Sequence, residues 1–345
     1  MDIEVLTEAA AFRILQPEWL QLLSRLPFQS VFFTPQWQET WWRHFGAGRQ
    51  LFLLTARSSD GTLQGLAPLM VRQSDGGPAY LELIGDLEWC DYLDILIAPS
   101  HQHDVGQALA HALVTRCGND IVLCLQNLSP SSLTLEVLHE RLSAYNFNVE
   151  LKTIETCPAI ALPEDWETYL GLLRGKDRHE LRRKLRRAET AATLDYYVTQ
   201  DAARLDADIE TFITLHRMSQ QDAKQGFMTP PKALFFRDLV HQLWPEGWLE
   251  LAFLSADSQP IAALCCFAFG TTYAAYNSGY HPDYSHLSAG IVLFAERIRS
   301  AIARRFTVFD FLRGNEAYKY RFGATDRLLS QLLARTACPV EGSCV

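Results

Sequence analysis

The sequence lacks the features that would direct it across a membrane or let it hold a structural metal. The apolar run 260–269 is far shorter than the roughly 20 residues of a membrane-spanning helix. The N-terminus, MDIEVLTEAAAF, has no basic stretch ahead of an apolar core, so it is not a signal peptide. The 8 cysteines form no C-x-x-C pair, which is the spacing of zinc and thioredoxin-type sites. We therefore expect a cytoplasmic protein without a metal.

The sequence also lacks an excess of positive charge. Its formal net charge of -9 excludes a surface that binds nucleic acid or anionic lipid over its whole extent, because both need clustered cations. We expect no DNA partner. Any site for an anion must be local.

What is present is the composition of a packed globular protein. Hydrophobic residues make up 48% and charged residues 21% of the 345 positions. A chain of this length is longer than a domain with a single hydrophobic core usually is, so we predict two domains. A similar succession of helical and strand patterns begins again after Thr156-Cys157-Pro158. We therefore place the domains at 1–156 and 157–336, with a tail at 337–345.

Each half mixes helical and strand patterns. In the first half we expect helices at 17–26, 36–45, 103–116 and 133–145 and strands at 51–56, 63–71, 80–84, 91–97 and 121–125. In the second half we expect helices at 166–173, 177–192, 203–220, 231–243 and 289–305, strands at 248–255, 261–269, 272–280, 308–312 and 328–334, and a helical turn near Tyr318. Together they predict an α+β (α/β layered) fold. The helix 289–305 would make strands 272–280 and 308–312 parallel, through a right-handed crossover.

Two clusters follow these strands. Ser288, Ala289 and Gly290 open a helix, where exposed N–H groups suit a pyrophosphate, although Ser288 is equally an ordinary N-cap. Polar residues also crowd the carboxyl end of strand 308–312, where ligands bind in parallel sheets. They are Asp310, Arg313, Glu316, Tyr318 and Lys319, and the alternative is a salt-bridged surface turn.

The segment 176–187 is rich in basic residues. It is either a solvated helix face held by Leu181 and Leu185, or a contact for an anionic acceptor or for a cofactor phosphate. Arg182 and Arg183 are the substrate-binding candidates within it. In the first half, Asp91, Tyr92 and Asp94 line an acceptor cleft between the domains or cap a strand end.

Several of these stretches together resemble one family. They are Tyr276-Asn277-Ser278-Gly279-Tyr280-His281, Ser288-Ala289-Gly290, Phe309-Asp310-Phe311-Leu312-Arg313-Gly314 and Tyr318-Lys319, with Asp91-Tyr92-Leu93-Asp94, Cys157-Pro158 and 176–183 in agreement. The combination is similar to the GNAT-like acetyltransferases associated with cellulose and other polysaccharide biosynthesis. These are relatives of the Fem-type peptidoglycan aminoacyltransferases.

The resemblance implies two tandem GNAT-like domains. The first would be degenerate and lie on the acceptor side, and the second would bind acetyl-CoA or another acyl-CoA. The pantetheine would lie between the strands 272–280 and 308–312, and its pyrophosphate would meet the helix start. The implied cofactor-binding residues are Tyr276, Asn277, Ser278, Gly279, Ser288, Ala289, Gly290, Arg313 and Gly314. The sequence departs from simple GNAT enzymes in lacking the full glycine-rich pyrophosphate signature.

The implied reaction is direct attack of an amine or hydroxyl on the thioester. Asp310, Glu316 or His281 would accept the proton, and Tyr318 or Lys319 would stabilise the developing charge. The acceptor would be a small or sugar-linked molecule, such as a nucleotide-sugar or cell-envelope precursor. Association with an envelope or polysaccharide synthesis complex and the oligomeric state stay open. The alternatives are a Fem-type aminoacyl-tRNA-dependent transferase and a catalytically silent scaffold of a polysaccharide biosynthesis complex.

Overall fold

The computed structural model describes residues 1–117, 121–219 and 228–336, and these fold into two compact units. One unit holds Met1–Glu155 together with residues 327–336, and the other holds Thr156–Asp326, apart from the residues that are not described. Each unit contributes its own strands and helices. The strand pairing, mixed and mostly antiparallel, confirms the predicted α+β class.

In the first unit the strand order is β1-β2-β3-β4-β6-β13, and β5 pairs with β3. The strands are β1 (Asp2–Leu6), β2 (Arg49–Arg57), β3 (Leu63–Arg72), β4 (Ala79–Leu83), β5 (Leu96–Ile97), β6 (Ile121–Leu128) and β13 (Thr325–Thr336). The helices are α1 (Ala11–Leu23), α2 (Pro35–Phe45), α3 (Gln102–Cys117) and α4 (Leu133–Ala144). The helices α1 and α3 pack on the sheet, with α2 beside α1 and α4 beside α3.

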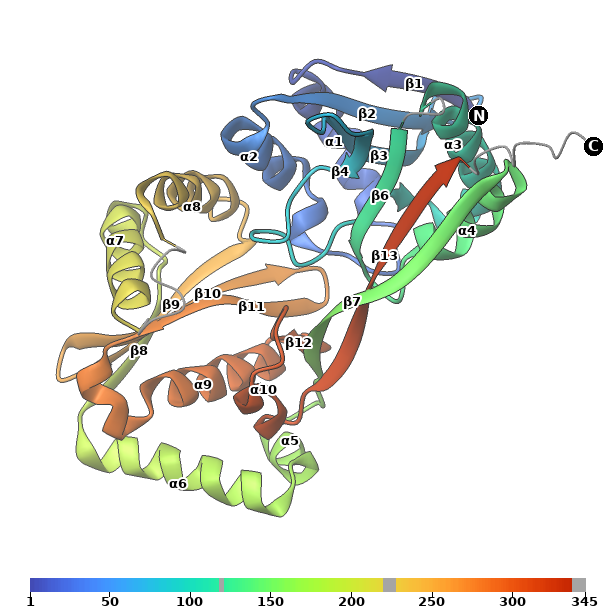
Figure 1. Ribbon diagram of the computed structural model, residues 1–345. Coiled ribbons are helices and arrows are strands. Elements are labelled where there is room, and N and C mark those ends of the chain that lie inside the picture. The colour runs from blue at the N-terminus through green and yellow to red at the C-terminus, as the bar shows by residue number, and fades with distance from the viewer. Residues whose placement is uncertain (118–120, 220–227, 337–345) are drawn as a thin grey trace, which may run out of the picture. The chain divides into compact units, whose positions relative to one another are not determined.

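In the second unit the strand order is β7-β12-β11-β10-β9-β8, and β7 belongs to this unit only from Thr156 onward. The strands are β7 (Phe147–Ala161), β8 (Leu194–Val198), β9 (Leu249–Ala256), β10 (Gln259–Phe269), β11 (Thr272–Tyr280) and β12 (Val308–Asp310). The helices are α5 (Trp166–Leu172), α6 (Gly175–Ala191), α7 (Ala202–Met218), α8 (Pro230–Leu243), α9 (Ala289–Ala303) and α10 (Ala317–Arg321). Figure 1 shows α7 and α8 on one side of the sheet and α6 and α9 on the other.

The helix α9 returns the chain from β11 to β12, and the two strands are parallel, as predicted. Its apolar face is built from Val292, Ala295, Ile298 and Ile302, which are buried against the sheet. This crossover is the part of the fold that positions the site. Its two ends are the junctions from β11 into α9 and from α9 into β12.

Some elements differ from the prediction. Of the predicted strand 91–97 only Leu96–Ile97 is a strand, because side-chain and loop hydrogen bonds hold the preceding residues. The strands β1, β7 and β8 were not predicted; β7 is largely exposed on both faces over its first ten residues, so it carries no clean alternation. The last strand, β13, pairs with β6 of the first unit, so the second unit ends at Asp326 and not at 336. The tail 337–345 lies outside the described residues.

Candidate functional site

The strands β11 and β12 pair over only a short stretch. Their register runs from Thr272 opposite Val308 to Ala274 opposite Asp310, where β12 ends. The strand β11 continues to Tyr280, so from Ala275 onward its β12-side edge has no strand partner in the described part of the chain. The pairing of β11 with β10 also shifts register next to Tyr276. A backbone edge of this kind can accept an extended ligand as an added strand.

The open edge leads to the start of α9. A short turn of 3-10 helix, Pro282–Leu287, follows β11, and Ser288 then adopts the left-handed conformation with φ 56°. Its side chain does not cap α9. At Gly290 no packed neighbour among the described residues lies within 4 Å of where a Cβ would stand. The first turn of α9 therefore keeps uncapped N–H groups and free space in front of them, as a bound anion requires.

A cation from α6 also reaches this helix start. The Nη2 of Arg187 donates a hydrogen bond to the Ser288 hydroxyl at 2.8 Å. The Nε of the same guanidinium is buried and has no hydrogen-bond partner in the described residues. The basic helix α6 packs on α9 and on the turn before it. Positive charge is thus added to the helix N-terminus.

The other end of α9 leads to the polar cluster after β12. Asp310 is buried, and its carboxylate accepts a hydrogen bond from the Leu312 N–H at 2.7 Å. Leu312 and Gly314 both have positive φ, of 57° and 106°. For a leucine this conformation is strained and is held only where the surroundings fix it.

Lys319 is the group that fixes this loop. Its ammonium is buried and donates to the carbonyls of Leu312, Arg313 and Gly314 at 3.1, 2.7 and 3.0 Å. It also pairs with Glu316 at 2.9 Å. An ammonium has three protons, and these acceptors already account for all of them. The contacts assign Lys319 to holding the loop, and its predicted role in charge stabilisation stays a prediction.

Tyr318 lies beside this loop with its ring in an aromatic cluster. The ring packs against Phe294 and Phe311, with centroids 5.4 and 6.2 Å away. Burial raises the pKa of its hydroxyl above the ordinary value of 10. Within the described chain no hydrogen bond to that hydroxyl is present. It is therefore a protonated donor at neutral pH, whereas Glu316, 48% exposed, faces solvent and Lys319.

His281 is separated from the other predicted catalytic residues. It follows the end of β11, seven residues beyond Ala274, which is in register with Asp310. At the rise of a strand this corresponds to roughly 20 Å. Its Nδ1 accepts from the Asp283 N–H at 3.3 Å and caps the turn before α9. His281 and Asp310 cannot both contact one reacting atom, so His281 lies with the turn before α9 and apart from Asp310.

Among the predicted cofactor residues of β11, Gly279 has a packing role. A Cβ at this position would lie 2.2 Å from the backbone nitrogen of His216 in α7. Only glycine lets α7 approach β11 this closely. The ring of Tyr276 packs against Phe267 with centroids 4.8 Å apart, while Asn277 and Ser278 are partly exposed on the same strand.

The predicted acceptor residues of the first half are inside the first unit. Tyr92 is buried against Phe28 and Phe32. The Asp94 carboxylate accepts hydrogen bonds from the hydroxyls of Ser132 and Thr134, and burial raises its pKa to about 6. Asp91 is buried as well. Their positions correspond to the capping interpretation of these residues, and substrate contact at them stays a prediction.

The two arginines chosen in the basic helix are both in ion pairs. Arg182 pairs with Glu167 at 2.9 Å, and Arg183 pairs with Glu180 at 2.8 Å. Their side chains are about half exposed, at 49% and 48%. The middle of α6 is therefore a solvated, paired face. Residues at its start, which belong to the resembling stretch 176–183 but were not chosen as site candidates, line a cavity instead.

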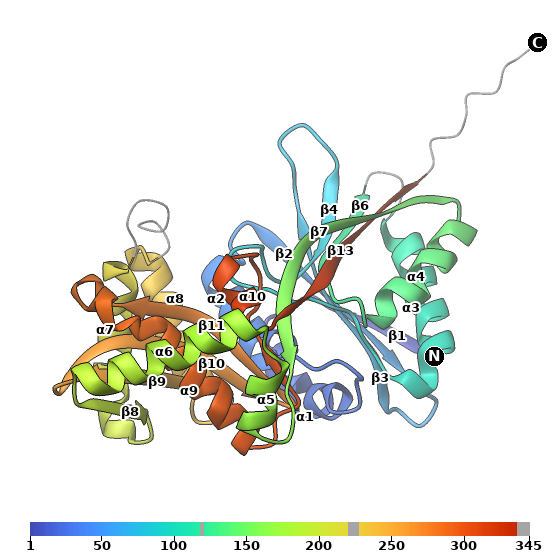
Figure 2. The ribbon, with the colours of Figure 1, turned by 90° about the horizontal axis from the view of Figure 1, so that it is seen from below.

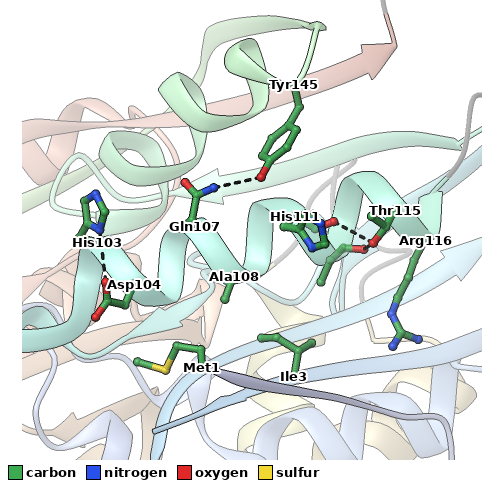
Figure 3. A pocket seen from close by; sticks show the side chains of 11 residues that line it. Met1, Ile3, His103, Asp104, Gln107, Ala108, His111, Thr115, Arg116 and Tyr145 are labelled. Atoms are coloured by element: carbon green, nitrogen blue, oxygen red, sulfur yellow. Dashed lines mark hydrogen bonds and ion pairs between the residues drawn. The ribbon is translucent and has the colours of Figure 1, made fainter.

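That cavity has a volume of 710 Å³ and lies between the start of α6 and α10. The lining residues that the sequence did not predict are Arg174, directly before α6, and Tyr320 and Arg321, which follow the predicted Lys319 in α10. A second cavity, of 550 Å³, lies in the first unit between β1 and α3 (Figure 3). There Gln107 donates to the Tyr145 hydroxyl at 3.0 Å, and none of the predicted site residues lines it.

The described residues contain no group of three or more His, Cys, Asp or Glu side chains placed to hold a metal ion. In the same part of the chain, no helix combines the length and apolar character needed to cross a lipid bilayer.

Known proteins resemble this chain in sequence over part of its length and in fold over most of it. Residues 175–320 match the family model described as the acetyltransferase (GNAT) domain. No curated protein sequence matches the chain. Among solved structures, the chain is similar to FemX, with 12% identity, a TM-score of 0.63, and coverage of 96% of this chain and 97% of that one.

Two further structures are similar over most of their length. One is the L-PGS from Bacillus licheniformis, at 11% identity and TM-score 0.57, covering 94% of this chain and 93% of that chain. The other is a tandem GNAT protein from the clavulanic acid biosynthesis pathway, at 12% identity and TM-score 0.50, covering 98% and 100%. Such identities show the fold alone, and the narrower resemblance to the cellulose-biosynthesis family stays a prediction. Residues 175–320 thus match a GNAT-type acetyltransferase domain, and the chain as a whole is similar in fold to a tandem GNAT protein.

Proposed function

We propose that this protein is an acyl-CoA-dependent N- or O-acyltransferase, with acetyl as the expected acyl group. The observation that carries the proposal is the open edge of β11, which runs from the end of β12 to the uncapped start of α9. An extended thioester arm fits such an edge, and its pyrophosphate fits the helix start. The free space at Gly290 and the unpartnered Nε of Arg187 support the fit of phosphate groups there.

The chain's own residues would then act as follows. The backbone at Ser288–Gly290 and the Arg187 guanidinium hold the phosphates, and the β11 edge orients the arm. A bound acyl-CoA supplies an acyl group that is activated toward attack by an amine or hydroxyl. Asp310, at the strand end, takes the proton from the nucleophile. The protonated hydroxyl of Tyr318 is the donor beside the same loop.

The acceptor is proposed to be a sugar, a nucleotide-sugar or another cell-envelope or polysaccharide precursor. The domain match and the tandem GNAT fold support the transfer chemistry, while the acceptor class rests on the resemblance in sequence. The alternative donor is an aminoacyl-tRNA. The similarity in fold to FemX supports the alternative equally, so both donors must be compared directly.

The test is a calorimetric titration with acetyl-CoA of the full chain and of two charge-introducing variants. Gly290→Glu places a carboxylate in the space before α9, where like-charge repulsion should weaken acetyl-CoA binding by about 30-fold or more, or ~2 kcal/mol. Gly171→Glu is the matched control, because its Cβ also meets no neighbour within 4 Å and it lies on α5.

Equal affinity of Gly290→Glu and the unmodified chain would place the phosphates elsewhere. Absence of acetyl-CoA binding, with binding of charged tRNA in a parallel titration, would transfer the proposal to the aminoacyl donor. If the chain binds neither acetyl-CoA nor charged tRNA, the result would favour the alternative of a catalytically silent scaffold.

A further inference from the structure

The 710 Å³ cavity of the second unit is lined by more cationic than anionic side chains. It is lined by Arg174, Lys176 and Arg321, with His179 and Tyr320 beside them. In Figures 1 and 2 the start of α6 lies next to α10, the two elements that supply these residues. The volume is that of a small-molecule site, which holds a ligand larger than a free ion.

The three cations of this cavity have no ion-pair partner in the described chain. Two carboxylates, Asp177 and Glu180, also line it, but Glu180 is turned to Arg183 at 2.8 Å and Lys184 at 3.8 Å. The hydrogen bond from Arg183 lowers the pKa of Glu180 to about 2, so this carboxylate is ionised and already compensated. The cavity therefore has a net positive charge in a chain whose formal net charge is -9.

The position of α10 relates the cavity to the reacting end of the site. Ala317, Tyr320 and Arg321, spaced three and four apart, form the face of α10 toward the cavity. Lys319 of the same helix holds the carbonyls of the loop after Asp310. Since a helix with its side chains is about 10 Å across, the cavity lies within roughly that distance of the loop.

We propose that this cavity binds a phosphoryl group of the acceptor, and so selects a phosphorylated molecule as the substrate. The inference rests on the proposed acyltransferase function and gives the acceptor its chemical class. A phosphoryl group carries close to two negative charges, and arginine forks bind it through two parallel hydrogen bonds. The three cations provide the charge, and the guanidinium groups of Arg174 and Arg321 provide the forks.

The test is direct binding of inorganic pyrophosphate, measured by calorimetry with saturating CoA present so that the donor phosphate site is filled. The unmodified chain should bind one pyrophosphate. The double variant Arg174→Gln, Arg321→Gln should bind it at least about tenfold more weakly, because it removes two of the three cations that line the cavity, together with their charged hydrogen bonds. Arg299→Gln is the control, since Arg299 is an exposed arginine of α9 that does not line the cavity.

The inference is overturned if the unmodified chain binds no pyrophosphate, or if the double variant binds it as well as Arg299→Gln does. It is also overturned if malonate binds as tightly as pyrophosphate, because the site would then be a general dianion site. The CoA affinity of each variant is measured first. If the unmodified chain does not bind CoA, the proposed function is contradicted. If it binds CoA but the double variant and Arg299→Gln bind pyrophosphate equally well, only this inference is contradicted.

Discussion

Replacing Lys319 by methionine removes a buried ammonium and keeps the length of the side chain. Three carbonyls, of Leu312, Arg313 and Gly314, then lose their donor, and Glu316 loses its partner. Removing one partner of a buried charged group typically costs about 3–5 kcal/mol. The contacts to Arg313 and Gly314 are only partly buried, so water can replace some of them. We therefore expect a loss of about 3 kcal/mol, close to a hundredfold in the local opening equilibrium.

Hydrogen exchange read by mass spectrometry measures this opening directly. The reporters are the Leu312 N–H, bonded to Asp310, and the Gly314 N–H, bonded to the Thr156 carbonyl. Lys184→Met is the matched control, because Lys184 makes a single 3.8 Å ion pair, with the carboxylate of Glu180, whose side chain is 38% exposed. Lys184→Met should change the free energy of local opening, as read from hydrogen exchange, by less than ~0.5 kcal/mol.

The reasoning is refuted if Lys319→Met leaves exchange at Leu312 and Gly314 unchanged while turnover with acetyl-CoA collapses. That result would return Lys319 to the catalytic role predicted from the sequence.

Two further predictions concern positions that the sequence assigned to ligands. Gly279→Ala should destabilise the second unit by about 2–3 kcal/mol, because its Cβ would collide with the α7 backbone; Gly171→Ala, with no neighbour within 4 Å, should not, and equal urea midpoints would contradict the packing role. Asp94→Asn tests a pH dependence. The folded Asp94 holds its proton up to about pH 6 and the unfolded one only to about 3.8, so its contribution to stability falls as pH rises through this window. Between pH 4 and pH 7, the free energy of unfolding of Asp94→Asn, measured in urea, should therefore rise by about 3 kcal/mol relative to that of the unmodified chain. If the difference between the two free energies stays constant over this range, the pKa of Asp94 is not raised.

The sequence predicted the crossover of the second unit well because its signals are local. The strand at 272–280 matches β11, and the helix starting at Ala289 matches α9, since apolar periodicity and a turn mark both. The strand at 308–312 is shorter in the structure, ending at Asp310, because Leu312 turns into the left-handed region. That turn depends on Lys319, a contact seven residues away that no local pattern encodes.

Pairing between strands that are far apart in the chain could not be predicted from the sequence. β13 joins β6 by a contact such as Leu332 opposite Leu125, which only the folded chain brings together. The same holds for the side chains of the site. Asp94 reads as a polar residue near a turn, yet its partners Ser132 and Thr134 come from the start of α4. Its burial could not be read from residues 91–94 alone.

The basic helix shows how one charge run can serve different purposes along its length. In the sequence its cations look equivalent, but Arg182 and Arg183 have carboxylate partners, whereas Lys176 and Arg187 face the cavity and the start of α9. On the assignments proposed above, Arg187 serves the donor phosphates and Lys176 the acceptor phosphoryl group. Eleven residues of helix separate them, or about 17 Å at 1.5 Å per residue. Because α6 is rigid and packs on α9, it would fix the spacing of the two anions, and so the place where acyl group and nucleophile meet.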